Sequence, residues 1–130
     1  MNHFKILFLL LLIIMAVEDI YAQDKGLVVR IAKLVIDSAQ LESYKVALKE
    51  HAETAVHIEA GVLNLYAVYE KNKPTHVTVF EIYTNNEAYK AHLLTPHFLK
   101  YKTVTKDMVK SLELLETVPI ALETKYKNSN

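Results

Sequence analysis

The stretch VLNLYAVYEKNKPTHVTVFEIYT, residues 62–84, decides the fold. Residues 62–70 and 75–84 are rich in β-branched and aromatic side chains, which predicts two strands. The KNKP segment between them is short and polar, so it predicts a turn that contains Pro74. Two strands joined in this way predict an antiparallel hairpin. In the second strand, Val77 and Val79 point to one face and Phe80 and Ile82 to the other.

A strand and a long helix are predicted before the hairpin. Residues 27–36, LVVRIAKLVI, have the composition of a strand. Residues 41–60 contain neither glycine nor proline, and their apolar residues recur at steps of three or four. These patterns predict an amphipathic helix, which Gly61 is expected to end.

A broken helix and a last strand are predicted after the hairpin. Asn85 or Asn86 is expected to begin a helix that runs through Thr95. Pro96 then starts a second helical segment, from His97 to about Lys110. Residues 111–122 predict the last strand, in which Pro119 indicates a sheet edge or a bulge.

The predicted order β-α-β-β-α-β is that of the α+β, ferredoxin-like fold. Its two helical parts can cover only one face of a four-stranded sheet. The predicted strands carry apolar residues on both faces, so the second face also needs cover. A homodimer packed sheet against sheet would provide it.

The N-terminus has the layout of a secretory signal. Residues 1–22 carry Lys5, then an apolar run, then Ala22 as a small residue before a cleavage site. The apolar run is too short for a stable membrane span, although an uncleaved anchor is the alternative. We therefore expect a secreted or periplasmic protein with a single domain at 23–130, whose core is 27–120 and whose polar tail is 123–130.

The composition excludes several function classes. The chain has 15 basic and 15 acidic residues with no basic stripe, which gives no support for nucleic-acid binding. It has two glycines, so it lacks the glycine-rich motifs of nucleotide-binding loops. It has no cysteine, which excludes disulfides, thiolate metal sites and a cysteine nucleophile.

Histidines are the best candidates for proton transfer. His51 lies on the apolar stripe of the long helix, where it is either a core residue or a pocket residue. On a continuous helix His92 and His97 would point about 140° apart, so the sequence predicts no metal site. We expect His92 to face a cavity near His51, and His97 to shape the start of the second helical segment.

Aromatic residues of the hairpin are candidate ligand contacts. Tyr66, Tyr69 and Phe80 could line a cavity between sheet and helices, with Asn64 as a polar contact; the alternative is that they are ordinary core residues. Glu81 is costly to bury unpaired, so we expect Lys33 or Arg30 to pair with it.

The segments EAGVLNLYAVYE (59–70) and VTVFEIYTNNEAYKAHLLTPHFLKY (77–101) resemble the antibiotic biosynthesis monooxygenase (ABM) domain family. The resemblance covers about residues 27–120. Its most specific parts are Glu59 with Gly61, Glu81 with Tyr83, and the run from Ala91 to Phe98. It is greatest to the quinol monooxygenase-like members and implies a dimeric α/β barrel with a pocket between the helices and the sheet of each subunit.

The resemblance also implies a chemistry. Oxygenase members of the family oxidise phenols and quinols with O₂ and need no cofactor, because a deprotonated phenol can itself reduce O₂. It therefore implies a cofactor-independent monooxygenase of a small aromatic substrate, which the layout of residues 1–22 predicts to be exported. We expect His92 and His51 to be its catalytic residues. The alternatives are a non-catalytic module that binds a small apolar ligand and a haem-binding or haem-degrading member. The haem reading loses support because the chain has no tryptophan.

Overall fold

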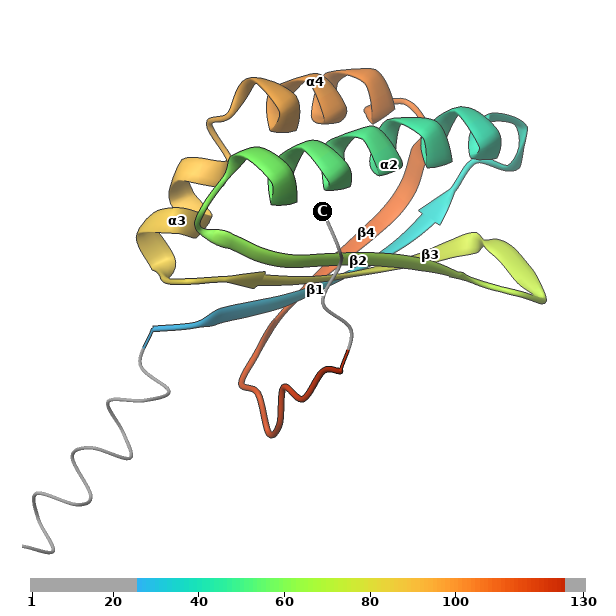
Figure 1. Ribbon diagram of the computed structural model, residues 1–130. Coiled ribbons are helices and arrows are strands. Elements are labelled where there is room, and N and C mark those ends of the chain that lie inside the picture. Colours follow the sequence, from blue (N-terminus) through green and yellow to red (C-terminus); the bar gives the residue numbers. More distant parts are fainter. Residues whose placement is uncertain (1–25, 126–130) are drawn as a thin grey trace, which may run out of the picture.

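The computed structural model describes residues 26–125, which form a four-stranded sheet with helices on one face (Figure 1). The strand order is β2-β3-β1-β4, and every neighbouring pair is antiparallel. This is the predicted ferredoxin-like α+β fold. The elements are β1 (Val28–Ile36), the 3₁₀ helix η1 (Ser38–Gln40), α2 (Leu41–Ile58), β2 (Val62–Glu70), β3 (Lys73–Tyr83), α3 (Asn86–His92), α4 (Pro96–Thr105) and β4 (Val109–Thr117).

The two prolines of the sheet region lie elsewhere than predicted. The hairpin turn is Lys71–Asn72, so Pro74 is inside β3 and not in the turn. Its missing N–H is tolerated because the pairing of β3 with β1 reaches only as far as His76. The last strand ends at Thr117, so Pro119 lies beyond it and marks neither an edge nor a bulge within it.

The sequence predicted that Gly61 ends the long helix, and this prediction was wrong. α2 ends at Ile58, and Glu59 has an extended backbone while its N–H still donates to the Ala55 carbonyl. Gly61 is needed for a close approach instead. A Cβ atom at this position would lie 2.5 Å from the Cβ of Ala88, so only glycine lets α3 pack against this turn.

The core lies between the helices and the sheet. Tyr44 and Leu48 of α2 pack against Leu34, Val77 and Val79 of the strands. No helix within residues 26–125 is long and apolar enough to cross a membrane. The signal proposed for residues 1–22 lies outside the described residues, as does the end of the polar tail.

The opposite face of the sheet carries a row of apolar residues. The register aligns four partners, one from each strand: Tyr66, Phe80, Ile31 and Leu115. Tyr66 is 51% exposed, and no helix lies over this face (Figure 1). The described residues therefore leave this apolar row without a covering layer of helices.

Candidate functional site

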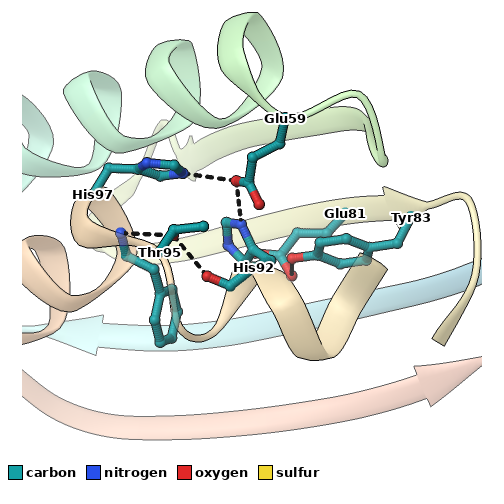
Figure 2. A network of polar contacts seen from close by, with 7 residues as sticks. Glu59, Glu81, Tyr83, His92, Thr95 and His97 are labelled. Carbon is teal, nitrogen blue, oxygen red and sulfur yellow. Dashed lines mark hydrogen bonds and ion pairs between the residues drawn. The ribbon is translucent and has the colours of Figure 1, made fainter. Parts of the chain in front are cut away.

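A carboxylate joins two histidines below the end of α2. The Oε2 atom of Glu59 lies 2.7 Å from Nδ1 of His92 and 2.7 Å from Nε2 of His97. Because an ionised carboxylate can only accept, each imidazole donates an N–H to it. Figure 2 shows the Glu59 carboxylate between the two rings. His92 is 1% exposed, whereas the Glu59 and His97 side chains are partly buried, so the cluster extends from the protein interior toward the surface.

The break between α3 and α4 brings the two histidines together. Asn85 caps α3 by accepting a hydrogen bond from the N–H of Ala88, and α3 ends at His92. Thr95 caps α4, and its hydroxyl also donates to the His92 carbonyl, 2.7 Å away. The 140° separation expected for a continuous helix therefore does not apply, and the side chain of His97 at the start of α4 binds Glu59.

His51 lies beside this cluster and is also buried, at 3% exposure. Its ring centroid is 5.1 Å from that of His92, and it stacks on Tyr101 at 4.8 Å. Burial, followed by the nearby charges of His92 and His97, lowers the pKa of His51 to about 4. The imidazole of His51 is therefore neutral at neutral pH.

His51 and His92 line the same cavity, as the sequence predicted. The cavity has a volume of about 100 Å³, on the scale of the roughly 150 Å³ site that holds one benzene ring in an engineered protein. Nδ1 of His51 and Nε2 of His92 are buried and have no hydrogen-bond partner. Since buried polar atoms are normally satisfied, each can serve a ligand or a water.

The sheet supplies a second polar group to this cavity. Glu81 accepts a hydrogen bond from the Tyr83 hydroxyl at 2.9 Å, and both side chains line the cavity. Arg30 is the partner of Glu81 in the β1–β3 register, but its guanidinium donates to Glu116 on β4. Lys33 pairs in register with Thr78. The expected ion pair with Glu81 is thus absent from the ion pairs of residues 26–125.

The predicted ligand contacts of the hairpin do not lie at this cavity. Asn64, Tyr66 and Phe80 are on the sheet face opposite the helices, where Asn64 donates to the Tyr66 hydroxyl at 2.7 Å. Tyr69 is on the helix side but lines a separate groove against α2, with Lys45 over its ring. Tyr69 thus lines a groove between sheet and helix, as predicted, whereas Asn64, Tyr66 and Phe80 do not. Their placement was wrong because alternation does not tell which of two apolar faces the helices cover.

Glu59, His92 and His97 are also the one group within residues 26–125 whose donor atoms could hold a metal ion. Their three ligand atoms lie within 4.8 Å of one another. Two imidazoles and a carboxylate suit zinc or iron(II). The hydrogen bonds from both histidines to Glu59 account for the same geometry with no ion, and the predicted absence of a metal stays a prediction.

Comparison with known proteins places the chain in a family. The family model for antibiotic biosynthesis monooxygenases matches residues 27–104. The chain belongs to this family. A structure from Bacteroides thetaiotaomicron, described as a candidate antibiotic biosynthesis monooxygenase, is 47% identical, with a TM-score of 0.76 over 80% of this chain and 99% of that one. No curated protein matches the chain.

More distant structures share the fold of this ABM protein. A candidate monooxygenase from Lactobacillus acidophilus is 29% identical, with a TM-score of 0.70 over 73% of this chain and 45% of that one. A candidate antibiotic biosynthesis monooxygenase from Nitrosomonas europaea is 18% identical, with a TM-score of 0.69 over 74% and 92% of the two chains. At 18% identity the similarity to the Nitrosomonas europaea structure concerns the fold alone.

Sequence reasoning missed three residues of this candidate site. Glu59 and Tyr83 were noticed only as parts of the family resemblance, and Tyr101 was not considered. Tyr101 stacks on His51, and its hydroxyl lies 2.7 Å from that of Tyr44. Its position one helical turn after His97 was the available signal, because residues at this spacing share a helix face.

Proposed function

We propose that this ABM protein is a monooxygenase that oxidises a small phenol or quinol with O₂ in the cavity of His51 and His92, without a cofactor. The observation that supports it most is the pairing of His92 with Glu59. Because the Nδ1–H of His92 donates to the carboxylate, the other nitrogen, Nε2, is left as an acceptor. A fixed acceptor in a buried cavity is what a general base for a phenol requires.

In this proposal His92 takes the phenol proton onto Nε2. The charge of Glu59 stabilises the imidazolium, as a carboxylate does when it orients a catalytic histidine. His51 stays neutral at neutral pH because of its lowered pKa, so it can hold the ring without repelling the charged His92. The apolar walls, which include Leu48 and Val79, keep bulk water from the phenolate.

The substrate then supplies the electrons. The phenolate transfers one electron to O₂, and the two radicals combine to form a carbon–oxygen bond at an electron-rich ring carbon. The resulting peroxide anion gains two protons, one of them the phenol proton returned by His92, loses water by cleavage of its O–O bond and loses the ring C–H proton, leaving a carbonyl. The balance is phenol plus O₂ to quinone plus water, and no external reductant is consumed.

The homodimer and export also belong to the proposal. A second copy on the open sheet face would cover the row of Tyr66, Phe80, Ile31 and Leu115. The layout of residues 1–22 supports a secreted or periplasmic location. Mass spectrometry of the protein from its native host tests export, and a chain that retains Met1 in the cytoplasm would contradict it.

Oxygen consumption tests the activity. We expect single-ring phenols and quinols to be oxidised with incorporation of one atom from ¹⁸O₂, and His92→Ala to lower turnover by about 10²-fold, as loss of a general base does. His57→Ala, at an exposed histidine of α2, is the matched control and should keep full activity. Binding of the same compounds without oxygen consumption would instead indicate a non-catalytic module.

A further inference from the structure

One buried titratable group in the cavity has no part in the proton abstraction. Glu81 lies on β3 in the floor of the cavity, whereas His51 and His92 come from α2 and α3 above it. In Figure 2 the Glu81 and Tyr83 side chains lie beside His92, on the side away from His97. The cavity therefore has a basic side made by helices and a carboxyl group on the side of the sheet.

We propose that Glu81 is a neutral carboxylic acid that donates a proton to the peroxide formed on the substrate, and that Tyr83 positions it. This rests on the proposed oxygenase function. In the step, the terminal peroxide oxygen takes the proton from Glu81, an O–H bond forms, and Glu81 becomes a carboxylate. Cleavage of the O–O bond then releases hydroxide, which takes the phenol proton back from His92 and forms water, and Glu81 regains a proton when the ring C–H proton is released.

The contacts of Glu81 favour its neutral form. Its Oε2 accepts from Tyr83, so a proton on Oε1 remains free to point into the cavity. Arg30, which is opposite Glu81 in the β1–β3 register, is held 3.1 Å from Glu116, and its guanidinium lies 4.5 Å from the centroid of the Tyr89 ring. A buried carboxyl without its own ion pair tends to stay protonated.

Other charges around Glu81 act in both directions. The titratable and charged groups that line the same cavity are Arg30 on β1, Tyr83 on β3, His51 on α2, Tyr89 and His92 on α3, and Tyr101 and Lys102 on α4. Burial raises the pKa of Glu81, while the Tyr83 hydrogen bond and the charges of His92 and Arg30 lower it less. The net direction is upward, which agrees with the geometry.

The protonation state can be measured without any activity. Infrared difference spectra of the whole protein should show the carbonyl band of a neutral carboxyl at neutral pH, and Glu81→Gln should remove it. Glu113→Gln, an equal change at an exposed position of β4, should not. A spectrum in which Glu81 is ionised at pH 7 would overturn the proposal whatever the activity of the protein.

Turnover then separates this proposal from the oxygenase function. With a phenol that the wild type oxidises, Glu81→Gln should lower kcat by about 10²-fold, release hydrogen peroxide, and still form the phenolate under anaerobic conditions. Glu81→Asp, which keeps an acid, should restore coupling in part. Tyr83→Phe removes a hydrogen bond that favours the ionised form, so it should move the alkaline limb of the pH profile to higher pH.

Two outcomes of these experiments are decisive in different ways. If the wild type oxidises no phenol, the oxygenase function fails, and the acid role fails with it even if the infrared band is present. If the wild type is active and Glu81→Gln is equally fast and fully coupled, the oxygenase function stands and the role of Glu81 is refuted.

Discussion

Nδ1 of His92 lies 2.7 Å from Oε2 of Glu59, although 33 residues separate them in the chain. This contact ties α3 to the residue that follows α2. The same oxygen holds His97 at the start of α4. One carboxylate therefore fixes three helices relative to one another and sets which nitrogen of His92 carries the proton.

Replacing Glu59 by glutamine should destabilise the protein. Both histidine N–H groups donate to the same oxygen of Glu59, and the amide oxygen that replaces it is uncharged, so two charge-assisted hydrogen bonds become weaker neutral ones. A hydrogen bond to a charged group contributes about 1.5–3 kcal/mol and a neutral one about 0.5–1.5 kcal/mol, so we expect a loss of about 1–3 kcal/mol of unfolding free energy, which urea denaturation measures. Glu53→Gln is the matched control, because Glu53 is exposed and its ion pair with Lys49, at 3.8 Å, lies on the surface of α2. Such surface pairs contribute about 0.3–0.5 kcal/mol. Equal small losses in both variants would show that the cluster does not hold the helices.

Much of the fold could be predicted from the sequence, because each element has a strong local signal. The spacing of apolar side chains predicts the hairpin and the β-α-β-β-α-β order. Asn85 and Pro96 predict the starts of the two pieces of the second helix. Two helix ends were predicted too late, since α3 ends at His92 and not Thr95, and α4 ends at Thr105 and not near Lys110. The errors at Pro74 and Pro119 depend on how far neighbouring strands extend. That is a tertiary property, and no local pattern reports it.

The candidate site was predictable only in part. His51 and His92 were expected in one cavity, and both line it. The contact of Glu59 with both histidines could not be read from spacing, because it depends on the bend between α3 and α4. Tyr66 and Phe80 were assigned to the wrong face because both faces of the hairpin are apolar, so their alternation fits either orientation.

Acidification should destabilise the protein through His51. Its pKa is about 4 in the folded state, against 6.5 for an ordinary histidine, so the unfolded chain binds more protons between these values. The contribution of neutral His51 to the unfolding free energy is therefore fully present above about pH 6.5. It is lost as the pH drops toward 4, and the loss is at most about 3 kcal/mol. Urea midpoints across this range measure the slope. His51→Phe, which keeps a ring beside Tyr101, should flatten it, while His57→Phe should not; equal slopes in wild type and His51→Phe would contradict the assignment.

The purified protein should contain no stoichiometric metal. Both histidines already donate to Glu59, and a metal would have to displace these hydrogen bonds with only three ligands from the described residues. Elemental analysis after expression without added metal, followed by zinc titration with thermal unfolding as readout, tests this. Zinc or iron bound one to one, and lost in His97→Ala but retained in His57→Ala, would show instead that the cluster is a metal site.

The last prediction concerns the open face of the sheet. Val68 is 64% exposed and lies in register with Thr78, which puts it on the face opposite the helices, next to the row of Tyr66, Phe80, Ile31 and Leu115. Large exposed apolar patches are uncommon on monomers, so we expect a dimer by sedimentation at micromolar concentration. Val68→Lys would bury an unpaired charge in such an interface and should shift the protein to the monomer, because burying a lone charge costs several kcal/mol. Val46→Lys is the matched control, since Val46 is 68% exposed on α2 and a charge there stays in water. A wild-type monomer, or a dimer that Val68→Lys leaves intact while Val46→Lys disrupts it, would place the interface elsewhere than on this face.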